Sequence, residues 1–407
     1  MKIAVAGGGA AGIFGAISIK ESKPDADVCI FEKSDKLLLK VKISGGGRCN
    51  ITNAMADVKE LVKNYPRGNK ELISVFMKFS PADIMNWFEY RGVKTKTEED
   101  NRVFPVTDNS QTVIDCILNE AKTKNIQIKL NHTIQEIRKE NTGFIINLKQ
   151  GEKIYFDKIL IAQGGSNKPE AYEWIRNLGH TIINPVPSLF TFVLSQNIFS
   201  GLEGVSVPEV EITLKNGKRL AQSGSILITH GGVSGFGILR FSAFAARILN
   251  EKNYKFTLAI NWLPEFTKEQ VYNKLLNFKN TTPYKSLGSA SLFKIPSRLW
   301  KRLLQLSGIE ADKKILEISN QTINKFVNEL TEQHIDISGK NTNKEEFVTA
   351  GGVCLKEVNF KTMESKICPG IYFAGEVLDI DGVTGGFNFQ SAWSTAWIAG
   401  KSIGKAD

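Results

Sequence analysis

The first twelve residues constrain the fold more than any other part of this chain. An apolar run from Lys2 to Ala6 is followed by glycines at positions 7, 9 and 12, and then by apolar residues at helical spacing. A buried strand that turns through Gly-x-Gly-x-x-Gly into a helix is typical of dinucleotide-binding units. Gly7 permits the turn, Gly9 lets the backbone approach a pyrophosphate, and Gly12 lets the helix pack on the strand. The sequence therefore predicts a Rossmann-like α/β domain, with Ala10 and Ala11 opening the helix.

A second apolar run, Val28 to Phe31, ends at Glu32. An acidic residue about twenty positions after the glycine turn binds the ribose hydroxyls in such units and repels a 2′-phosphate. The alternative, a solvated loop carboxylate, is less consistent with this spacing. Glu32 is therefore predicted to bind the ribose of a dinucleotide, with Lys33 beside it.

The segment SGGGRCNITN, residues 44 to 53, is too rich in glycine for a helix or strand and can lie against a planar or anionic ligand. Arg48 is a candidate partner for a pyrophosphate, because guanidinium forms bidentate bonds to phosphate. Cys49 has no second cysteine near it in sequence, so a packing role is favoured over a redox role. An ordinary turn remains the alternative for the whole segment.

Two more buried strands end in glycines. The run from Lys158 leads into Ala162, Gly164 and Gly165, and GIYFAGEV is followed by TGGFNFQSAW. Glu376 could accept a hydrogen bond from a ribityl hydroxyl. The helix start at Gly385 and Gly386, with the N–H groups of residues 388 to 390, could stabilise negative charge on a reduced flavin. The alternatives are a plain strand-to-loop turn and a structural helix cap.

Composition excludes several classes of protein. Five cysteines without a CxxC pair, and four histidines without ligand spacing, predict neither a disulfide framework nor a metal site. The longest apolar run falls short of the roughly eighteen residues of a membrane span, and a cytoplasmic location is expected. For the net charge of +10 and pI near 9.2, a solvated surface is preferred, then an anionic ligand, with nucleic acid unlikely.

The pattern of elements along the chain predicts three domains. The α/β pattern of the first 187 residues returns at 341–407, so these two segments are expected to form one flavin-binding domain. Alternating strands predict a β-barrel domain from 188–262 and 331–340. Several short helices at 263–330, punctuated by prolines, predict a helical insert in that barrel.

Together these motifs resemble one family, the bacterial FAD-dependent oxidoreductases of the two-dinucleotide-binding-domain class, which include aminoacetone-oxidase-like and bile-acid-reductase-like flavoproteins. The resemblance rests on GGGAAG, SGGGRCNITN, RVFP at residues 102 to 105, THGGVSG and AGEVLDIDGVTGGFNFQSAW, and it extends from residue 7 to about 400. The sequence departs from the family at Gln163, Gly232 and Phe236, where Thr, Phe and Pro are usual.

The resemblance implies a glutathione-reductase-like Rossmann domain interrupted by a β-barrel that carries a helical insert. It also implies non-covalent FAD, lined by residues from all four segments. Those residues are predicted to be Gly7, Gly9, Ala10, Ala11, Gly12, Glu32, Lys33, Gly47, Arg48, Cys49, Asn50, Ala162, Gly164, Gly165, Gly375, Glu376, Asp381, Gly386, Asn388, Phe389 and Gln390.

The expected function is a FAD-dependent oxidoreductase that moves hydride to or from a small organic substrate, with NAD(P)H as a transient donor. Because there is no second Gly-x-Gly-x-x-Gly turn after a strand, no permanent NAD(P) domain is expected. Two rival hypotheses stay open: an oxygen-using oxidase of small amines, and a flavin-containing protein that binds or modifies nucleic acid. The sequence points to no catalytic acid or base and to no oligomeric state.

Overall fold

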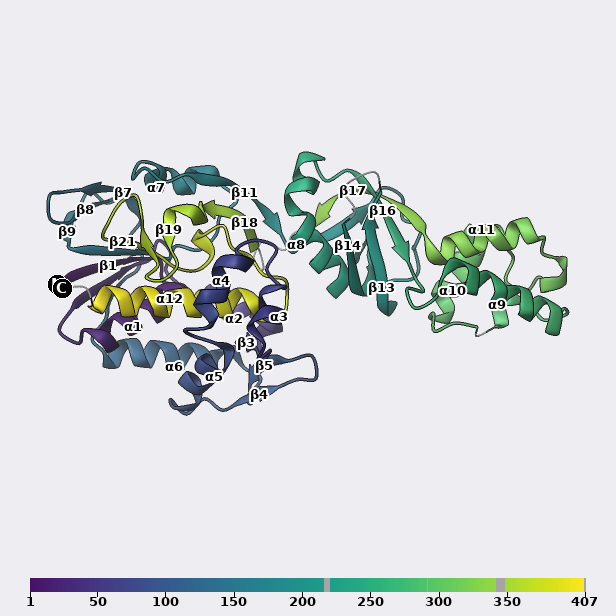
Figure 1. The fold of residues 1–407 in the computed structure, drawn as a ribbon, viewed down its shortest axis with the longest axis horizontal. Helices are drawn as coiled ribbons and strands as arrows, with labels where there is room; N and C mark the ends of the chain where they lie inside the picture. Colours follow the sequence, from purple (N-terminus) through teal and green to yellow (C-terminus); the bar gives the residue numbers. More distant parts are fainter. Residues whose placement is uncertain (216–219, 291, 342–347, 406–407) are drawn as a thin grey trace. The chain divides into compact units, whose positions relative to one another are not determined.

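The computed structural model describes residues 1–215, 220–290, 292–341 and 348–405. The chain divides into two compact units (Figure 1). Unit 1 comprises Met1–Ser188 and Asn343–Asp407, and unit 2 comprises Leu189–Thr342. Unit 1 is thus built from both ends of the chain, and unit 2 from its middle.

A seven-stranded sheet in the order β19-β20-β21-β10-β1-β2-β6 forms the centre of unit 1. Its strands from β21 to β6 are parallel. β1 (Lys2–Ala6), β2 (Asp27–Phe31) and β10 (Lys158–Ile161) bury nearly all their side chains, as expected for strands covered on both faces. The chain passes from β1 to β2 on one side, while β10 lies on the other side of β1. Ligands of open α/β sheets bind at the carboxyl edge beside such a reversal.

Two helices from opposite ends of the chain pack against each other in unit 1: α1 (Ala10–Ser22) and α12 (Phe387–Lys405) (Figure 1). A Cβ at Gly400 would lie 2.6 Å from the Cβ of Ser18 and 2.7 Å from the carbonyl oxygen of Gly15. Small residues therefore allow the two backbones to approach closely. Residues Ala11 to Ile19 are all buried, because α1 lies between the sheet and other elements.

The helical stretch expected from about residue 70 to 91 is two helices, α4 (Asn69–Phe76) and α5 (Pro81–Glu89). Ser80 caps α5 through a capping box with Asp83, and Pro81 occupies its first turn, so one helix cannot continue through this point. The other elements of unit 1 are α2 (Leu39–Ile43), α3 (Val58–Val62), α6 (Ser110–Thr123), α7 (Glu173–Arg176), β3 (Thr52–Asn53), β4 (Thr95–Thr97), β5 (Arg102–Pro105), β6 (Gln127–Lys129), β7 (Ile134–Lys139), β8 (Phe144–Leu148), β9 (Lys153–Phe156), β11 (Ile182–Ser188), β18 (Val348–Val353), β19 (Val358–Asn359), β20 (Glu364–Ser365) and β21 (Ile371–Phe373).

Unit 2 contains a closed antiparallel barrel in the order β12-β15-β14-β13-β16-β17. Gly232 is one of the positions at which the sequence departs from the family that it resembles. It pairs with Val193 in this barrel, and a Cβ at Gly232 would lie 2.2 Å from the carbonyl oxygen of Phe192. Close strand packing thus accounts for this glycine. The strands are β12 (Thr191–Leu194), β13 (Ser206–Leu214), β14 (Ala221–Thr229), β15 (Gly232–Ser234), β16 (Phe256–Asn261) and β17 (Gln333–Asn341).

Four α-helices accompany the barrel in the described part of unit 2. α9 (Lys268–Thr281), α10 (Ser297–Leu306) and α11 (Asn320–Thr331) lie where short helices were expected. α8 (Phe236–Glu251) was not expected, because it lies between strands and begins directly after a glycine-rich turn. The barrel and these helices share one hydrophobic core, which includes Trp262 and Trp300.

The predicted fold class is confirmed: a Rossmann-type domain is accompanied by a closed β-barrel. The division into three domains, with the helical insert as a domain of its own, stays a prediction. Across the residues that the structure describes, none of the helices combines the length and apolarity that a membrane crossing requires.

Candidate functional site

The turn between β1 and α1 has free space for a side chain at Gly9 but none at Gly7 or Gly12. A Cβ at Gly7, where φ is +114°, would lie 2.5 Å from the carbonyl oxygen of Ala162, and one at Gly12 would lie 1.9 Å from that of Gly7. At Gly9 no atom lies within 4 Å of the corresponding position. The turn is therefore closed by Gly7 and Gly12 and open at Gly9, which fits the approach of a pyrophosphate.

The start of α1 faces the same turn without a side-chain cap. Its N-cap residue is Gly9, and its first turn contains no acidic residue. The N–H groups of Ala10, Ala11 and Gly12 precede the first intrahelical bond, which Ile13 donates to the carbonyl of Gly9. Such a helix end attracts anions through its dipole and its free N–H groups.

Glu32 follows β2, and backbone donors hold its carboxylate in place. Its Oε2 accepts a hydrogen bond from the N–H of Gly8 at 2.7 Å, and its Oε1 accepts bonds from Ser34 N and Oγ at 2.9 and 2.8 Å. Oε1 thus already accepts two bonds, whereas Oε2 has a lone pair left for a further donor, such as a ribose hydroxyl. The side chain of Lys33 is exposed to solvent.

The ends of β10 and β21 lie at the same edge of the sheet. A Cβ at Gly375, directly after β21, would lie 2.8 Å from the Cβ of Ala11 in α1. Together with the approach of Ala162 to Gly7, this contact brings three predicted motifs together at the carboxyl edge. Gly164 also belongs to this edge and has a left-handed φ of +77°.

Glu376 lies in a polar cluster formed by segments far apart in the sequence. Its Oε2 is 2.5 Å from Lys40 Nζ, and its Oε1 accepts a hydrogen bond from the N–H of Thr349 at 2.9 Å. A Cβ at Gly165 would lie 2.6 Å from Thr349 Oγ1 and 2.7 Å from Glu376 Oε1. The Thr349 hydroxyl is buried without a hydrogen-bond partner in the described part of the chain. A buried hydroxyl of this kind is a ready partner for a bound ligand.

The glycines before α12 pack against the segment that follows SGGGRC. A Cβ at Gly386 would lie 2.4 Å from the carbonyl oxygen of Thr52. The amide of Asn50, in the orientation that satisfies its neighbours, accepts from the N–H of Gly386 at 2.9 Å and donates to the carbonyl of Thr52 at 2.9 Å. The structure therefore brings these two predicted motifs together as well.

The side chains at the start of α12 bind other protein groups. Asn388 exchanges hydrogen bonds with the backbone of Gly382 at 2.8 and 2.9 Å, and the Phe389 ring stacks on Trp393. Gln390 is wholly buried, bonds to Ser394, Thr52 and Phe79, and donates its own N–H to the carbonyl of Gly386. The helix begins at Phe387, so the N–H groups without an intrahelical acceptor belong to residues 387 to 389 rather than to Gln390.

Asp381 is completely buried and forms a two-pronged ion pair with Arg67 and a 2.7 Å hydrogen bond with Ser188 Oγ. Burial raises the pKa of the Asp381 carboxyl, while Arg67 and Ser188 lower it in part. Its partners in the structure are protein groups, and the predicted contact with FAD stays a prediction.

Three successive glycines, 45 to 47, have left-handed φ angles between 59° and 86°. No atom lies within 4 Å of where a Cβ would stand at Gly46 or Gly47, so this loop has one open face. Cys49 behind it is fully buried, and burial raises the pKa of its thiol to about 12. The thiol is therefore protonated and inaccessible, which supports packing over redox chemistry.

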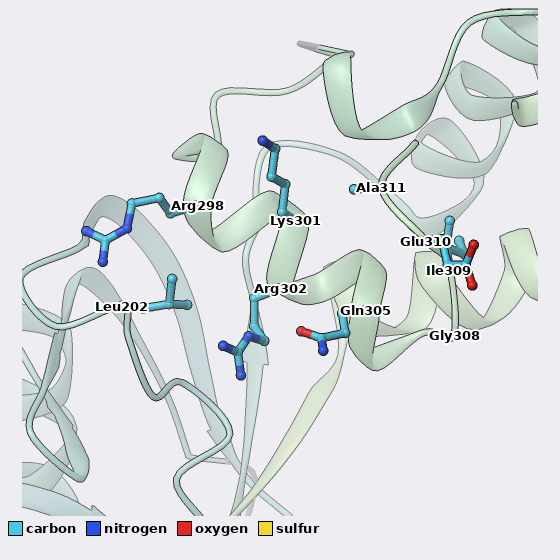
Figure 2. Close-up of a pocket in the computed structure, with 9 residues that line it drawn as sticks. All are labelled: Leu202, Arg298, Lys301, Arg302, Gln305, Gly308, Ile309, Glu310 and Ala311. Atoms are coloured by element: carbon cyan, nitrogen blue, oxygen red, sulfur yellow. The ribbon is translucent and has the colours of Figure 1, made fainter. Parts of the chain in front are cut away.

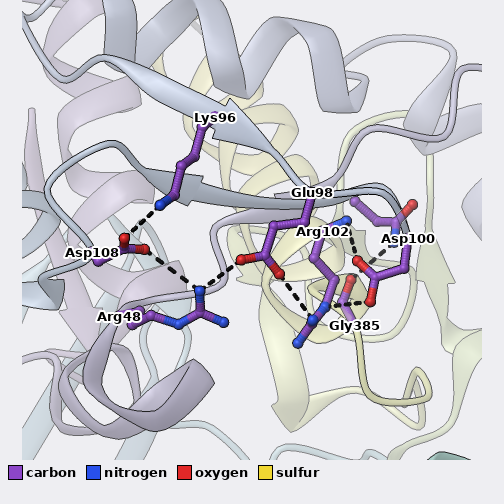
Figure 3. Close-up of polar contacts among 8 residues, drawn as sticks. Arg48, Lys96, Glu98, Asp100, Arg102, Asp108 and Gly385 are labelled. Atoms are coloured by element: carbon purple, nitrogen blue, oxygen red, sulfur yellow. Dashed lines mark hydrogen bonds and ion pairs between the residues drawn. The ribbon is translucent and has the colours of Figure 1, made fainter.

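Arg48 lies in a cluster of charges on the hairpin of β4 and β5 (Figure 3). Its Nη1 is 2.7 Å from Glu98 Oε1 and 3.5 Å from Asp108 Oδ1, and its guanidinium stacks on Phe104 at 3.9 Å from the ring centroid. Binding a pyrophosphate would require Arg48 to leave these carboxylates. The predicted phosphate contact stays a prediction, and in the structure Arg48 binds Glu98 and Asp108 and stacks on Phe104.

A Ser–His–Glu arrangement lies elsewhere in unit 1. His180 Nε2 is 2.9 Å from Ser365 Oγ, and its Nδ1 is 3.2 Å from Glu357 Oε2. His180 and Ser365 are buried and hydrogen-bonded to protein groups, so they have a structural role and connect the start of β11 to the segment of β19 and β20. The residues of this arrangement are far apart in sequence, and no sequence motif predicted their contact.

Within the described residues, no group of three or more His, Cys, Asp or Glu could hold a metal ion.

Comparison with known proteins bears on the fold and the site together. A family model described as "HI0933-like protein Rossmann domain" matches residues 1–402. A ribosomal RNA dihydrouridine synthase of Escherichia coli is 29% identical over 98% of this chain and 97% of its own. A 3-dehydro-bile acid delta(4,6)-reductase of Clostridium scindens is 28% identical over 98% of both chains.

Among solved structures, a 3-ketosteroid-delta4-(5alpha)-dehydrogenase of Rhodococcus jostii RHA1 is similar in fold, with a TM-score of 0.52 over 99% of this chain and 96% of that one, at 12% identity. The predicted family and enzyme class, a FAD-dependent oxidoreductase, are confirmed at this level. The electron donor and the substrate belong to a proposal.

Proposed function

The chain belongs to the HI0933-like protein Rossmann family, and from this membership we propose that it is a FAD-dependent reductase supplied with hydride by NAD(P)H. The observation that carries the proposal is the turn at Gly9, which opens onto free space at an uncapped helix end beside an oriented Glu32. Such a turn holds the pyrophosphate and ribose of a dinucleotide. FAD is preferred over NAD as the resident cofactor, because glycine-rich segments from both ends of unit 1 gather at the same edge.

When bound, FAD would supply the hydride-transfer chemistry. The chain binds and orients it. The N–H groups of α1 hold the phosphates, Glu32 accepts from the adenosine ribose, and Glu376 with Thr349 offers an acceptor and a hydroxyl farther along the edge. Since one dinucleotide turn is used by FAD, NAD(P)H binds transiently and leaves after giving up its hydride.

The two relatives named above suggest a common reaction. Dihydrouridine is uridine with two hydrogens added to the ring double bond next to a carbonyl, and a delta(4,6)-reductase saturates double bonds conjugated to one. We infer the same net step here: a hydride from NAD(P)H adds to the carbon β to a carbonyl, a proton from solvent adds to the α carbon, and NAD(P)⁺ is released.

Ribosomal RNA is the substrate that we place first. The Escherichia coli relative is named for it, and the basic charge of this chain is uneven. Unit 2 has 19 Lys and Arg against 12 Asp and Glu, a net charge of +7 out of the total of +10. An excess of positive charge concentrated in one part of a chain is the electrostatic signature of a nucleic-acid partner.

A small unsaturated ring ketone is the second candidate. The Clostridium scindens relative, which covers as much of the chain at nearly the same identity, favours it. This substrate needs no basic surface, so the charge of unit 2 would then have no role in recognition.

The experiment mixes the purified holoprotein and NADPH, under anaerobic conditions, with an unmodified ribosomal RNA transcript or with a delta(4,6) ketosteroid. Digestion of the RNA and mass spectrometry should reveal dihydrouridine, and the steroid should remain unchanged. Steroid reduction without dihydrouridine would select the second candidate. Turnover of small amines with oxygen, but none with either acceptor, would overturn both and make the protein an oxidase.

A further inference from the structure

Positive charge in unit 2 is concentrated in the segment that holds α9, α10 and α11. Residues 263–330 contain 11 Lys and Arg but 6 Asp and Glu. α10 carries Arg298, Lys301 and Arg302 and no acidic residue, while its opposite face buries Leu299 and Leu303 among its core contacts. α10 therefore packs by one face and presents cations on the other.

These cations border an open depression of about 700 Å³ (Figure 2). Gln305 of α10, Leu202 and the loop of residues 308 to 311 complete its lining. Glu310 is the single acidic residue of this lining, so the depression carries a net positive charge. All its lining residues belong to unit 2.

The two arginines are held by backbone carbonyls rather than by carboxylates. Arg302 donates to the carbonyl oxygens of Ile198 and Ser200, each at 2.9 Å, and Arg298 donates to that of Gly201. Carbonyl acceptors fix a guanidinium but leave its charge intact. None of the three cations of α10 forms an ion pair with a carboxylate among the described residues, and Lys301 is exposed. Their charge is available to an anionic partner.

An exposed aromatic ring lies beside the chain segment that follows the lining residues 308 to 311. Tyr284 is 74% exposed, and Lys314 Nζ lies 5.8 Å from its ring centroid. Lys314 forms a β-bridge with Ser286, and the same loop contributes Gly308 to the depression. An exposed ring beside basic side chains is the combination that binds unpaired nucleotides, by stacking on the base and pairing with the phosphate.

We propose that the α10 depression and Tyr284 form a docking site for unpaired RNA, with Arg298, Lys301 and Arg302 facing the phosphates and Tyr284 stacking on a base. The inference rests on the proposed ribosomal RNA substrate and adds the surface that recognises it. RNA fits better than a protein partner, because the site offers cations and one exposed ring rather than an apolar patch. The arginines also anchor α10, so Lys301 and Tyr284 are the residues to vary.

The test uses full-length holoprotein and a fluorescein-labelled RNA stem–loop with unpaired uridines, with binding followed by fluorescence anisotropy over a range of salt concentrations. Lys301→Glu should weaken binding by at least roughly fivefold and reduce the slope of log affinity against log salt by about one. Tyr284→Ala should weaken binding roughly tenfold and leave the slope unchanged. Lys252→Glu, an equal change of charge at the end of α8, should bind like the wild type.

Unchanged thermal midpoints and flavin absorbance would show that the variants fold. Equal losses for Lys301→Glu and Lys252→Glu, or wild-type affinity in both Lys301→Glu and Tyr284→Ala, would overturn the docking site. In the second case, dihydrouridine formation by the wild type would leave the proposed function standing. If Lys301→Glu and Tyr284→Ala both lose RNA binding but the wild type forms no dihydrouridine, the docking site is supported and the proposed function is overturned.

Discussion

Gly9 and Gly12 lie three residues apart in one turn, yet a side chain has opposite consequences at these positions. Gly9 has an extended backbone and free space where a Cβ would stand, so Gly9→Val should fold normally. The valine side chain would occupy the space of the pyrophosphate. We therefore expect the affinity for FAD to fall by more than about tenfold, which corresponds to 1.4 kcal/mol of binding free energy. Titration of the apoprotein with FAD, followed by flavin fluorescence, measures this loss. A variant that purifies with a full complement of flavin would contradict the placement of the cofactor.

Gly12→Ala is the matched control. The added Cβ would lie 1.9 Å from the Gly7 carbonyl oxygen, so the helix must shift from the strand. We expect a loss of folding free energy of about 1–3 kcal/mol, seen in the denaturation midpoint of the apoprotein. The two variants thus separate a ligand effect from a folding effect.

Thr349 tests the polar end of the site. Its buried hydroxyl has no partner in the described part of the chain, so Thr349→Val should leave the apoprotein as stable or slightly more stable. If FAD forms a hydrogen bond with this hydroxyl, Thr349→Val should lower the affinity for FAD by roughly 1 kcal/mol, about fivefold. Thr349→Ser should restore most of the lost affinity, because serine keeps the hydroxyl. Equal FAD affinity for all three proteins would remove Thr349 from the site.

His180 gives unit 1 a dependence of stability on pH. Burial lowers its pKa below the usual 6.5, so the unfolded chain takes up a proton more readily than the folded one. The stability that this neutral histidine contributes is complete above the unfolded pKa and is lost as pH falls through the folded pKa. His180→Asn should be about 1–3 kcal/mol less stable at neutral pH, and urea denaturation should show the gap narrowing towards pH 5. A constant gap would contradict this account.

For single residues, the sequence predicted the place in the fold better than it predicted the hydrogen-bond and ion-pair partners. Gly7, Gly9, Gly12 and Glu32 lie as their spacing indicates, because the constraint is local. Arg48 and Gln390 found protein partners that are distant in the chain, Glu98 for the first and Thr52 for the second. Such pairings depend on tertiary packing, which spacing along the chain does not encode.

Elements whose burial follows from a continuous apolar run were predicted from sequence, and those that depend on context were not. β1, α1 and β10 lie where their apolar patterns indicate. α8 lacks a capping side chain and follows strands directly, so no start signal marked it. The break between α4 and α5 had a signal, Ser80-Pro81, which a helical periodicity alone overlooks.

The contact of α1 with α12 offers a test at the scale of elements. Gly400→Ala would place a Cβ 2.7 Å from the Gly15 carbonyl oxygen and push the helices apart, at a cost of about 1–3 kcal/mol. The midpoint temperature of thermal unfolding should fall by several degrees. Ser402→Ala, two residues farther along α12 and only half-buried, should stay close to the wild type. Equal midpoints for the two variants would show that the helices can separate without loss.

For the whole molecule, the return of an α/β pattern near the C-terminus predicted one flavin-binding domain from two segments, and unit 1 contains both ends of the chain; the predicted domain bounds stay a prediction. The concentration of positive charge in unit 2 was less visible, because most of its lysines are dispersed in sequence and only Arg298, Lys301 and Arg302 of α10 lie close together. This distribution is what separates a nucleic-acid substrate from a small one in the present proposal.

The most direct test of the central claim is anaerobic stopped-flow absorbance of the purified protein, mixed separately with NADH and with NADPH. We expect a bound flavin whose visible band bleaches rapidly with at least one of the two nucleotides and returns when an acceptor with a carbonyl-conjugated double bond is added. A band that neither nucleotide bleaches would contradict it, because a reductase of this kind must take its hydride from NAD(P)H.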